Sequence, residues 1–299
     1  MSFSNFYLVG GTGADINAGS TTGAAPNAAA TGGSWTNATN TFVATGGTPF
    51  SGANIGDYVS VYADGATVTT YVAQITTVVS NVSVILSGAI KYGTAPTDGG
   101  ANRSAVLGGA WNTEQVLAAG GLATTTVPQA TKINIKQATY TITASRTISM
   151  AGATTTPLWF SGYNANPGDL DADTTNSLSK PVFALNSTFV LTASGAHQTW
   201  SSISVTGSRS GTIWAQSGAS QTMVRCRFDN SSANAAAIAV NATISTATFA
   251  YCWLKTPTSA TTSGTALIGS TTSTWIGCVF EGGGLAGELR AQGQQVDPN

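Results

Sequence analysis

Two carboxylates recur at one position of a repeated pattern near the C-terminal end of the sequence. Asp229 and Glu281 each stand three positions after a cysteine, Cys226 and Cys278. Paired carboxylates cleave glycosidic bonds when they lie about 5 Å, or about 6.5 to 9.5 Å, apart. If successive repeats stack as strands about 4.8 Å apart, these two acids lie about 9.6 Å from each other. They are therefore candidates for an inverting glycosidase pair, and the alternative is a solvated or ion-paired corner near Lys255.

A second group of acids is a candidate metal site. Asp169, Asp171 and Asp173 alternate within PGDLDADT, as the ligands of calcium loops often do. The loop departs from the EF-hand pattern, because Thr174 replaces the glycine at position six and Lys180 replaces the glutamate at position twelve. A solvated acidic loop is the alternative to a calcium site. No cofactor is expected from any motif in the chain.

The three cysteines mark a repeat. The interval from Cys226 to Cys252 recurs unchanged from Cys252 to Cys278. A large apolar residue follows each cysteine by two positions, which is the period-2 alternation of a strand with one buried face. Second apolar segments recur about half a period earlier, around Ile213, Ile238 and Leu267. Short strands repeated at a period of roughly 20 to 50 residues are typical of a solenoid, and we interpret this one as a parallel β-helix.

In a β-helix, the cysteines are predicted to form a core ladder of small apolar side chains at one corner of consecutive turns. Three cysteines leave one unpaired, and side chains stacked in parallel do not readily reach disulfide geometry, although distance alone does not exclude a bridge. Zinc is less favoured still, because there is no Cys-x-x-Cys pair and His197 is the one histidine of the sequence. This cysteine usage mildly favours an intracellular, reducing origin.

Composition excludes several classes of function. Charged residues make up 8% of the chain, against about 25% in ordinary proteins, and the net charge is −1. The eleven Lys and Arg residues are scattered, so we expect no nucleic-acid partner. We also expect no membrane association, because no apolar run has the length of a membrane-spanning helix and no secretory signal begins the sequence. The 42% of apolar residues is ample for a buried core.

Composition and turn signals also divide the chain. Residues 1–41 are rich in Gly, Ala and Thr and predict an irregular N-terminal arm, whereas residues 42–94 predict a small antiparallel β module for anchoring, with a turn at Asp64 and Gly65. Residues 103–284 predict a capping helix, around Glu114–Ala118, followed by the β-helix, and 285–299 form a C-terminal tail. The expected core of the module comprises Val59, Val61, Val72, Ile75, Val84 and Leu86.

The order of these segments resembles a known family. A short Ala-containing helix, then KINIKQATYTIT, RTISMAG and PLWFSGYN, then turns that end in xCxF, resembles the right-handed β-helices of the pectate-lyase-like superfamily. Within that superfamily, the Gly- and Thr-rich sequence is most similar to virion proteins of tailed bacteriophages, including tailspikes and head or tail decorations. The resemblance implies a homotrimer, capsid or tail proteins as partners, and a place in the virion after synthesis in the host cytoplasm.

Outward positions of the repeat bear on function. Arg227, Trp253 and Val279 follow the three cysteines by one position, so alternation turns them outward. An outward apolar stripe favours an oligomer interface, with Trp253 buried between subunits and Arg227 at the rim. Since no convincing catalytic set is present, we interpret the chain as a non-enzymatic virion structural protein. The alternative is a phage tailspike or receptor-binding protein that binds or cleaves a host surface polysaccharide, with exposed tryptophans stacking on the glycan.

Overall fold

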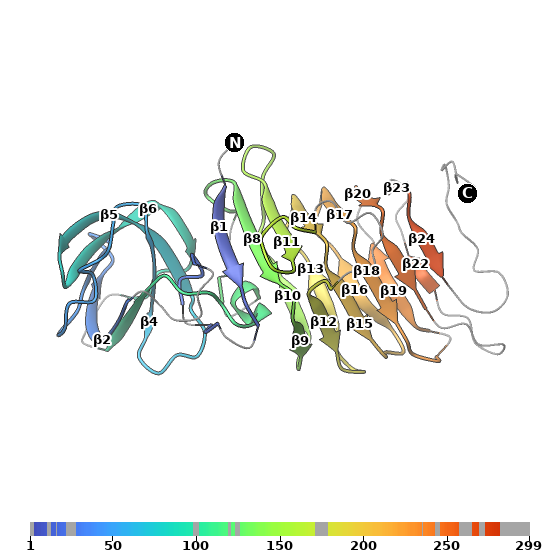
Figure 1. Ribbon diagram of the computed structural model, residues 1–299, viewed down its shortest axis with the longest axis horizontal. Helices are drawn as coiled ribbons and strands as arrows, with labels where there is room; N and C mark the ends of the chain where they lie inside the picture. The colour runs from blue at the N-terminus through green and yellow to red at the C-terminus, as the bar shows by residue number, and fades with distance from the viewer. Residues whose placement is uncertain are drawn as a thin grey trace. The chain divides into compact units, whose positions relative to one another are not determined.

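The computed structural model describes residues 3–10, 13–15, 17–21, 28–97, 102–118, 121–122, 126–170, 179–234, 236–242, 246–256, 265–268 and 273–281. Contacts divide the chain into two compact units, Met1–Asn134 and Ile135–Asn299. The described residues form strands throughout, with one short 3₁₀ helix, so the expected all-β class is confirmed (Figure 1).

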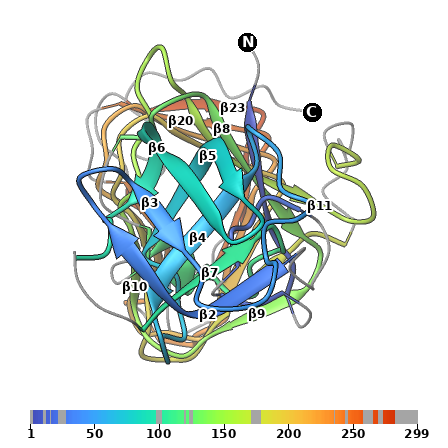
Figure 2. The same ribbon diagram turned by 90° about the vertical axis from the view of Figure 1, so that its left-hand side faces the viewer.

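The first unit contains a closed antiparallel barrel, with strand order β2-β3-β6-β5-β4-β7 (Figure 2). Closure of the sheet leaves no unpaired edge for another strand to join. The expected antiparallel module is therefore a barrel, and it draws one strand from the region expected to be an irregular arm and another from beyond residue 94. The strands are β2 (Ala28–Thr36), β3 (Thr41–Val43), β4 (Tyr58–Ala63), β5 (Tyr71–Ser80), β6 (Ser83–Gly93) and β7 (Arg103–Leu107).

The barrel core follows from alternation along these strands. Side chains that point inward pack as one apolar cluster, in which the rings of Trp35 and Tyr71 meet edge to face at 5.5 Å and those of Phe42 and Phe50 at 5.9 Å. Gly65 takes the left-handed conformation at φ 82°, as the expected turn after β4 requires. The residues expected in the core are all buried: Val59, Val61, Val72, Ile75, Val84 and Leu86.

The predicted capping helix is wrong in kind. Glu114–Leu117 form a single 3₁₀ turn, and Thr113 caps it by accepting a hydrogen bond from the Gln115 amide. The carboxylate of Asp15 accepts from the amides of Asn112 and Thr113, so the turn is fixed by a distant side chain. So short a segment offers too few i to i+4 hydrogen bonds to make an α-helix stable. No helix in the described part of the chain has the length and apolarity to cross a membrane.

Two further strands complete the first unit, β1 (Ser4–Leu8) and β8 (Thr131–Lys136), and the division between the units falls within β8. The amide of Ser4 donates to the carbonyl of Ala130 at 2.9 Å. Phe6, on β1, stacks on Trp111 at 5.1 Å and meets Tyr92 edge to face at 4.9 Å. Aromatic packing therefore anchors a strand from the region expected to be an irregular arm.

The second unit is a solenoid of parallel strands. The chain visits three sheets in turn, so that one strand of each sheet makes one rung, as expected for a β-helix. We call two of the sheets the charged sheet and the threonine sheet, after their outward side chains, and the third the middle sheet, because the chain visits it between the other two. The charged sheet contains β9 (Thr139–Ile142), β12 (Val182–Leu185), β15 (Ser204–Gly207), β18 (Arg227–Asn230), β21 (Trp253–Lys255) and β24 (Val279–Glu281).

The other two sheets follow the same order along the chain. The middle sheet contains β10 (Arg146–Ile148), β13 (Leu191–Ala193), β16 (Thr212–Gln216), β19 (Ile238–Ala242) and β22 (Thr265–Ile268). The threonine sheet of this unit contains β11 (Leu158–Tyr163), β14 (Gln198–Ser201), β17 (Gln221–Val224), β20 (Ala247–Ala250) and β23 (Thr274–Ile276). In each sheet the strands are paired in parallel with the strand of the rung before and after.

The solenoid interior is filled by side chains that repeat from rung to rung. On the threonine sheet, Phe160 stacks on Trp200 with ring centroids 3.9 Å apart. Trp214 of the middle sheet meets Trp200 edge to face at 5.1 Å and lies 5.5 Å from Phe228 of the charged sheet. These four rings are fully buried, so aromatic side chains from all three sheets share one core.

The corner between the threonine and charged sheets repeats in backbone conformation. The residue before each corner position takes the left-handed conformation, at Ser202, Arg225, Tyr251 and Gly277, with φ between 54° and 56°. Each cysteine follows such a residue and lies between two strands, not within one continuous strand as alternation predicted. The left-handed residue turns the chain at the corner. The alternation seen in the sequence therefore runs from a strand of the threonine sheet into the next strand, which belongs to the charged sheet.

Candidate functional site

Two rows of side chains run across the outer surface of the charged sheet. Register pairs Arg227 with Trp253 and Trp253 with Val279, which makes one row. The second row lies two positions along each strand and consists of Asp229, Lys255 and Glu281. Trp253 is half-buried, whereas Val279 is 54% exposed. The structure thus brings the sequence-predicted acids and the predicted interface residues onto one surface.

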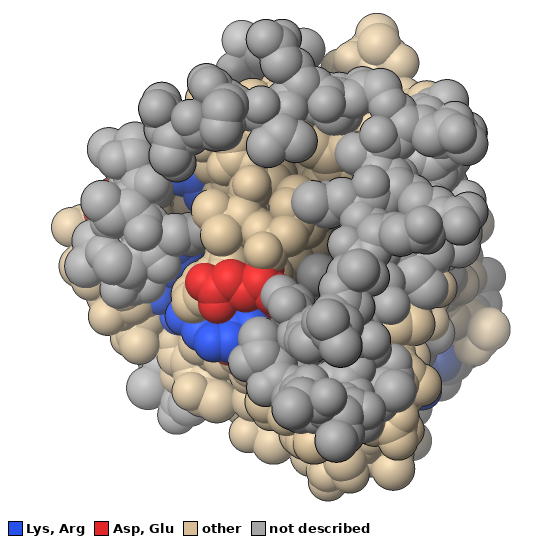
Figure 3. All heavy atoms as spheres, turned by 90° about the vertical axis from the view of Figure 1, so that its right-hand side faces the viewer, with Lys and Arg blue, Asp and Glu red and all other residues tan. Residues whose placement is uncertain are grey.

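Each acid of this surface is next to a cation. Arg227 Nη2 lies 2.8 Å from Asp229 Oδ2 on the same strand, and Lys255 Nζ lies 3.5 Å from Glu281 Oε2 on the next strand. The guanidinium of Arg227 also lies over the Trp253 ring, 3.8 Å from its centroid, with the Lys255 ammonium at 5.6 Å. Figure 3 shows acidic and basic side chains in contact on one face. Opposite charges thus lie side by side along β18 and alternate from strand to strand in the second row.

This arrangement is a poor match to a pair of catalytic acids. Asp229 and Glu281 occupy the same position on strands two apart, about 9.6 Å at the usual strand spacing. A general acid is kept protonated by an apolar, enclosed setting. The side chains of Asp229 and Glu281 are instead 18% and 44% exposed and lie beside a guanidinium and an ammonium group. Lys255 stands between the two acids, in the place where a water nucleophile would be needed.

The candidate calcium loop is described in part. Asp171 and Asp173 lie outside the described residues. Asp169 accepts hydrogen bonds from the backbone amides of Asn164, Ala165 and Asn166 at 2.7 to 3.0 Å. Slight burial raises the pKa of Asp169, but these amides outweigh it, so the pKa lies below its ordinary value. The Asp169 carboxylate therefore serves to close its own turn.

The cysteine corner has the geometry of a packed interior. Cys226 and Cys252 are buried, Cys278 is partly buried, and all three are free thiols. Each thiol donates to a carbonyl of the preceding rung, from Cys226 to Trp200 at 3.4 Å and from Cys252 to Met223 at 3.5 Å. Burial raises the pKa of Cys252 well above its ordinary value, and the thiols on both sides raise it further. Cys252, as a protonated and buried thiol, is therefore neither a nucleophile nor a metal ligand.

Among the described residues, no three His, Cys, Asp or Glu side chains are grouped so as to hold a metal ion. His197 takes the left-handed conformation, with φ 51°, in the turn before β14. Its amide donates to the Ala219 carbonyl of the following rung. It thus has a structural place in the corner between the middle and threonine sheets.

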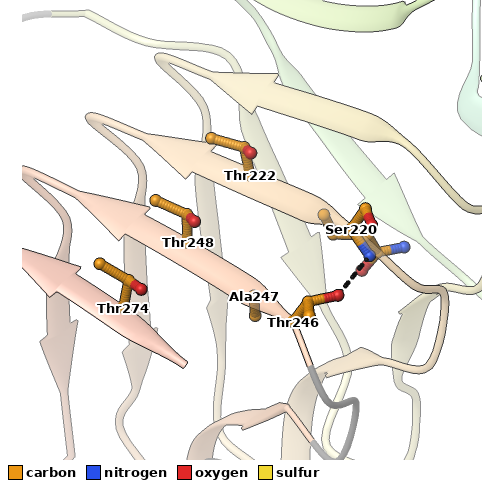
Figure 4. Close-up of a pocket in the computed structure, with 7 residues that line it drawn as sticks. Ser220, Thr222, Thr246, Ala247, Thr248 and Thr274 are labelled. Carbon is orange, nitrogen blue, oxygen red and sulfur yellow. Dashed lines mark hydrogen bonds between the residues drawn. The ribbon is translucent and has the colours of Figure 1, made fainter. Parts of the chain in front are cut away.

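Sequence reasoning missed the outer surface of the threonine sheet. Register aligns Thr199, Thr222, Thr248 and Thr274 on four successive strands. Figure 4 shows the last three with their hydroxyl groups pointing the same way. The signal was available, because the threonines from Thr222 onward each precede a cysteine by the same interval and so share the spacing of the repeat.

A shallow groove of about 350 Å³ lies along this row of threonines. Its hydrogen-bonding groups are mostly hydroxyls, and one of them, on Thr246, accepts from the Ser220 amide at 3.0 Å (Figure 4). Neutral hydroxyls can donate and accept, so the groove suits a polar, uncharged ligand. It is lined by Ser220, Gln221, Thr222, Thr246, Ala247, Thr248 and Thr274.

Comparison with known proteins gives limited likeness. No family model matches the chain, and no curated protein matches it. Among solved structures, the chain is similar to the tailspike protein gp49 from Pseudomonas phage LKA1, with 10% sequence identity and a TM-score of 0.18. The match covers 92% of this chain and 52% of that one, so the chain spans about half the length of the tailspike chain.

Proposed function

We propose that the chain is a non-enzymatic structural protein of a bacteriophage virion and that it decorates the head or tail. The single observation that carries the non-enzymatic part is the ion pairing of the charged sheet. Asp229 lies against Arg227 and Glu281 against Lys255, so each candidate acid already has a cationic partner. The virion setting is supported by the resemblance of the strand-rich sequence to phage β-helices.

The test of catalysis uses the purified chain and host surface polysaccharide. Structural function predicts that polysaccharide chains keep their length, as measured by size-exclusion chromatography, after prolonged incubation. Depolymerisation that disappears in both Asp229→Asn and Glu281→Gln would overturn the proposal. The matched control is Asp169→Asn, which changes a carboxylate that closes a turn elsewhere in the same unit.

The virion setting has its own test. Antibodies raised against the purified chain should label intact particles from a culture that produces it, as seen by immunogold electron microscopy. Labelling confined to cell debris, with particles unlabelled and the chain undetected in their mass spectra, would contradict a virion location. Labelling of head or tail would also identify the surface that the protein decorates.

We further propose that the subunits form a homotrimer through the row of Trp253 and Val279. The 54% exposure of Val279 beside a half-buried tryptophan favours a covered surface. Arg227 lies over the Trp253 ring, so it would form the border of such a contact. Multi-angle light scattering should give a trimer mass at micromolar concentration, and Val279→Ser with Trp253→Ser should lower it. A wild-type monomer at that concentration would exclude this interface.

A second candidate function is binding of a host glycan, and the hydroxyl-lined groove of the threonine sheet favours it. Sugar hydroxyls and threonine hydroxyls can each donate and accept, so they are matched in hydrogen bonding. In this case the immobilised wild-type chain would retain the polysaccharide, and a double variant that carries Thr222→Val and Thr248→Val would retain less of it. Equal retention by the two proteins would remove the groove from consideration.

A further inference from the structure

A ladder of glutamines fills the corner between the middle and threonine sheets. Gln198 donates through Nε2 to the carbonyls of Ile148 and Met150, at 3.1 and 2.7 Å. One rung further, Gln221 repeats the pattern with the carbonyls of Ala193 and Gly195, at 3.0 and 2.7 Å. Each glutamine thus holds two backbone acceptors of the preceding rung. Both glutamines are buried in the core.

The ladder continues through the amide oxygens. Gln198 Oε1 accepts from Gln221 Nε2 at 3.3 Å and from the indole of Trp200 at 3.0 Å. The oxygen of one rung is therefore satisfied partly by the amide nitrogen of the next. Register places Ala247 after Gln221, and alanine has no side-chain amide to donate. The ladder ends there, and within the described part of the chain the buried Oε1 of Gln221 has no hydrogen-bond partner.

Other unpartnered groups lie on β16, the strand that leads into this corner. Gln216 is 1% exposed, and neither its Nε2 nor its Oε1 has a partner among the described residues. It is paired in register with Ala193, whose carbonyl Gln221 binds, and with Ala242. Trp214 lies two positions earlier on the same strand and is also buried, and its indole nitrogen is likewise unpartnered. The small side chains of Ala193 and Ala242 leave the Gln216 side chain unmatched by equivalents in the adjacent rungs.

The unpartnered atoms form a complementary set. The donors are the N–H groups of Trp214 and Gln216, and the acceptors are the amide oxygens of Gln216 and Gln221. A cation would satisfy the acceptors alone, and an anion the donors alone. Water donates two hydrogen bonds and accepts two, so it matches both kinds of group without burying a charge. Leaving each group unmatched in an apolar interior would carry a desolvation penalty.

We infer that at least one ordered water molecule is bound inside the solenoid at this corner, next to the point where Ala247 ends the glutamine ladder. The water binds the side-chain amide of Gln216 and the Oε1 of Gln221, two side chains that both lie next to Ala193. At the end of the ladder the water donates to Gln221 Oε1, just as Gln221 Nε2 donates to Gln198 Oε1 one rung earlier. This site is independent of the virion function proposed above, because it lies in the core and not on an outer surface.

A crystal structure of the full chain at high resolution is the direct test. Density for water is expected within about 2.7 to 3.2 Å of both Gln216 and Gln221 Oε1. Oxygen-17 magnetic relaxation dispersion on the same protein should detect a long-lived internal water and should lose at least one in Gln216→Met. A crystal structure with no density at the corner, and dispersion unchanged by the substitution, would overturn the inference.

Thermal unfolding provides a test by sign. Gln216→Met keeps the side-chain length but removes the groups that hold the water, so Tm should fall by about 2 to 4 °C. A dry corner predicts the opposite, because methionine would remove two unpaired polar atoms and Tm would rise. Gln221→Met is the matched control. It breaks hydrogen bonds to Ala193 and Gly195 in either case, so its Tm should fall whether or not water is present.

Discussion

At two corners of the solenoid, side chains link each rung to the rung before it, but the two corners use different chemical groups. At the cysteine corner, Cys226, Cys252 and Cys278 repeat in three successive rungs, and each thiol makes a weak bond to a carbonyl of the rung before. At the glutamine corner, each amide binds the rung before but also presents an oxygen to the rung after. A thiol ladder can therefore stop at any rung at little cost, whereas an amide ladder leaves an acceptor unsatisfied where it stops.

The largest expected effect breaks the cysteine corner. Cys252→Asp would bury a carboxylate between two thiols in the core, and we expect the solenoid not to fold. Cys252→Ala and Cys252→Val should fold and lose at most about 3 kcal/mol, because they change the volume by about one methyl group. Circular dichroism and urea unfolding measure both. A folded Cys252→Asp protein with wild-type stability would show that residue 252 faces water.

The next effect breaks the glutamine corner. Gln198→Leu would remove the side-chain donor to the Met150 carbonyl and leave the Ile148 carbonyl with its backbone donors alone. It would also remove a partner of Gln221, and we expect a cost of about 2 to 4 kcal/mol. Thr199→Val, at the next position and facing outward, is the control and should cost less than about 0.5 kcal/mol. Urea unfolding of the two variants should separate them clearly. Similar values would mean that the ladder adds nothing to stability.

Alkaline pH distinguishes the corners, because thiols titrate and amides do not. The pKa of Cys252 is raised by burial above its unfolded value of 9.0. Above that pH the unfolded chain loses the proton while the folded chain keeps it. Ionisation therefore lowers the free energy of the unfolded state, and the free energy of unfolding falls as the pH rises. Below pH 9 this contribution is constant. The fall should be shallower in Cys252→Ala and unchanged in Thr199→Val, by unfolding at pH 8, 9 and 10. Parallel curves for wild type and Cys252→Ala would contradict the raised pKa.

The smallest expected effect concerns the left-handed backbone conformation at the cysteine corner. Arg225 stands in the left-handed conformation, φ 54°, immediately before Cys226. Asparagine tolerates this conformation better than other non-glycine residues, so Arg225→Asn should raise the free energy of unfolding by about 0.5 kcal/mol. Arg209→Asn, at a residue with ordinary φ but with its own hydrogen bond to Thr212, is the contrast and should not stabilise. A loss at Arg225→Asn would indicate that its side chain contributes more than the backbone costs.

Much of the solenoid could be predicted from the sequence because its rungs are similar to one another. The spacing of the cysteines sets the register of three rungs, and Ile213 and Ile238 fall on the middle sheet as expected. The barrel core was predictable for the same reason, since alternation within a strand is a local property. The domain boundaries, the right-handed coil and the trimer remain predictions.

The rest of the fold and of the candidate site depended on contacts between residues far apart in the sequence, which no local pattern contains. Strands β1 and β2 have no periodicity of their own, yet β2 is paired with β3 and β7, and Phe6 packs on Trp111. The ion pairs of Asp229 and Glu281 required the register between strands, which sequence spacing gave only approximately. The glutamine ladder was missed because its interval differs from that of the cysteines and because the third member is alanine. A repeat that fails at one rung is hard to see before the rungs are aligned.

The recurring left-handed corner has a consequence for how such proteins change length in evolution. Since Arg225, Tyr251 and Gly277 turn the chain in the same way, the segment from one such corner to the next is a complete module. Its duplication or loss would shift everything beyond it by one strand spacing, about 4.8 Å, while each surviving side chain kept its inward or outward direction. Gene length could then be tuned in whole rungs without redesigning either the core or the surface.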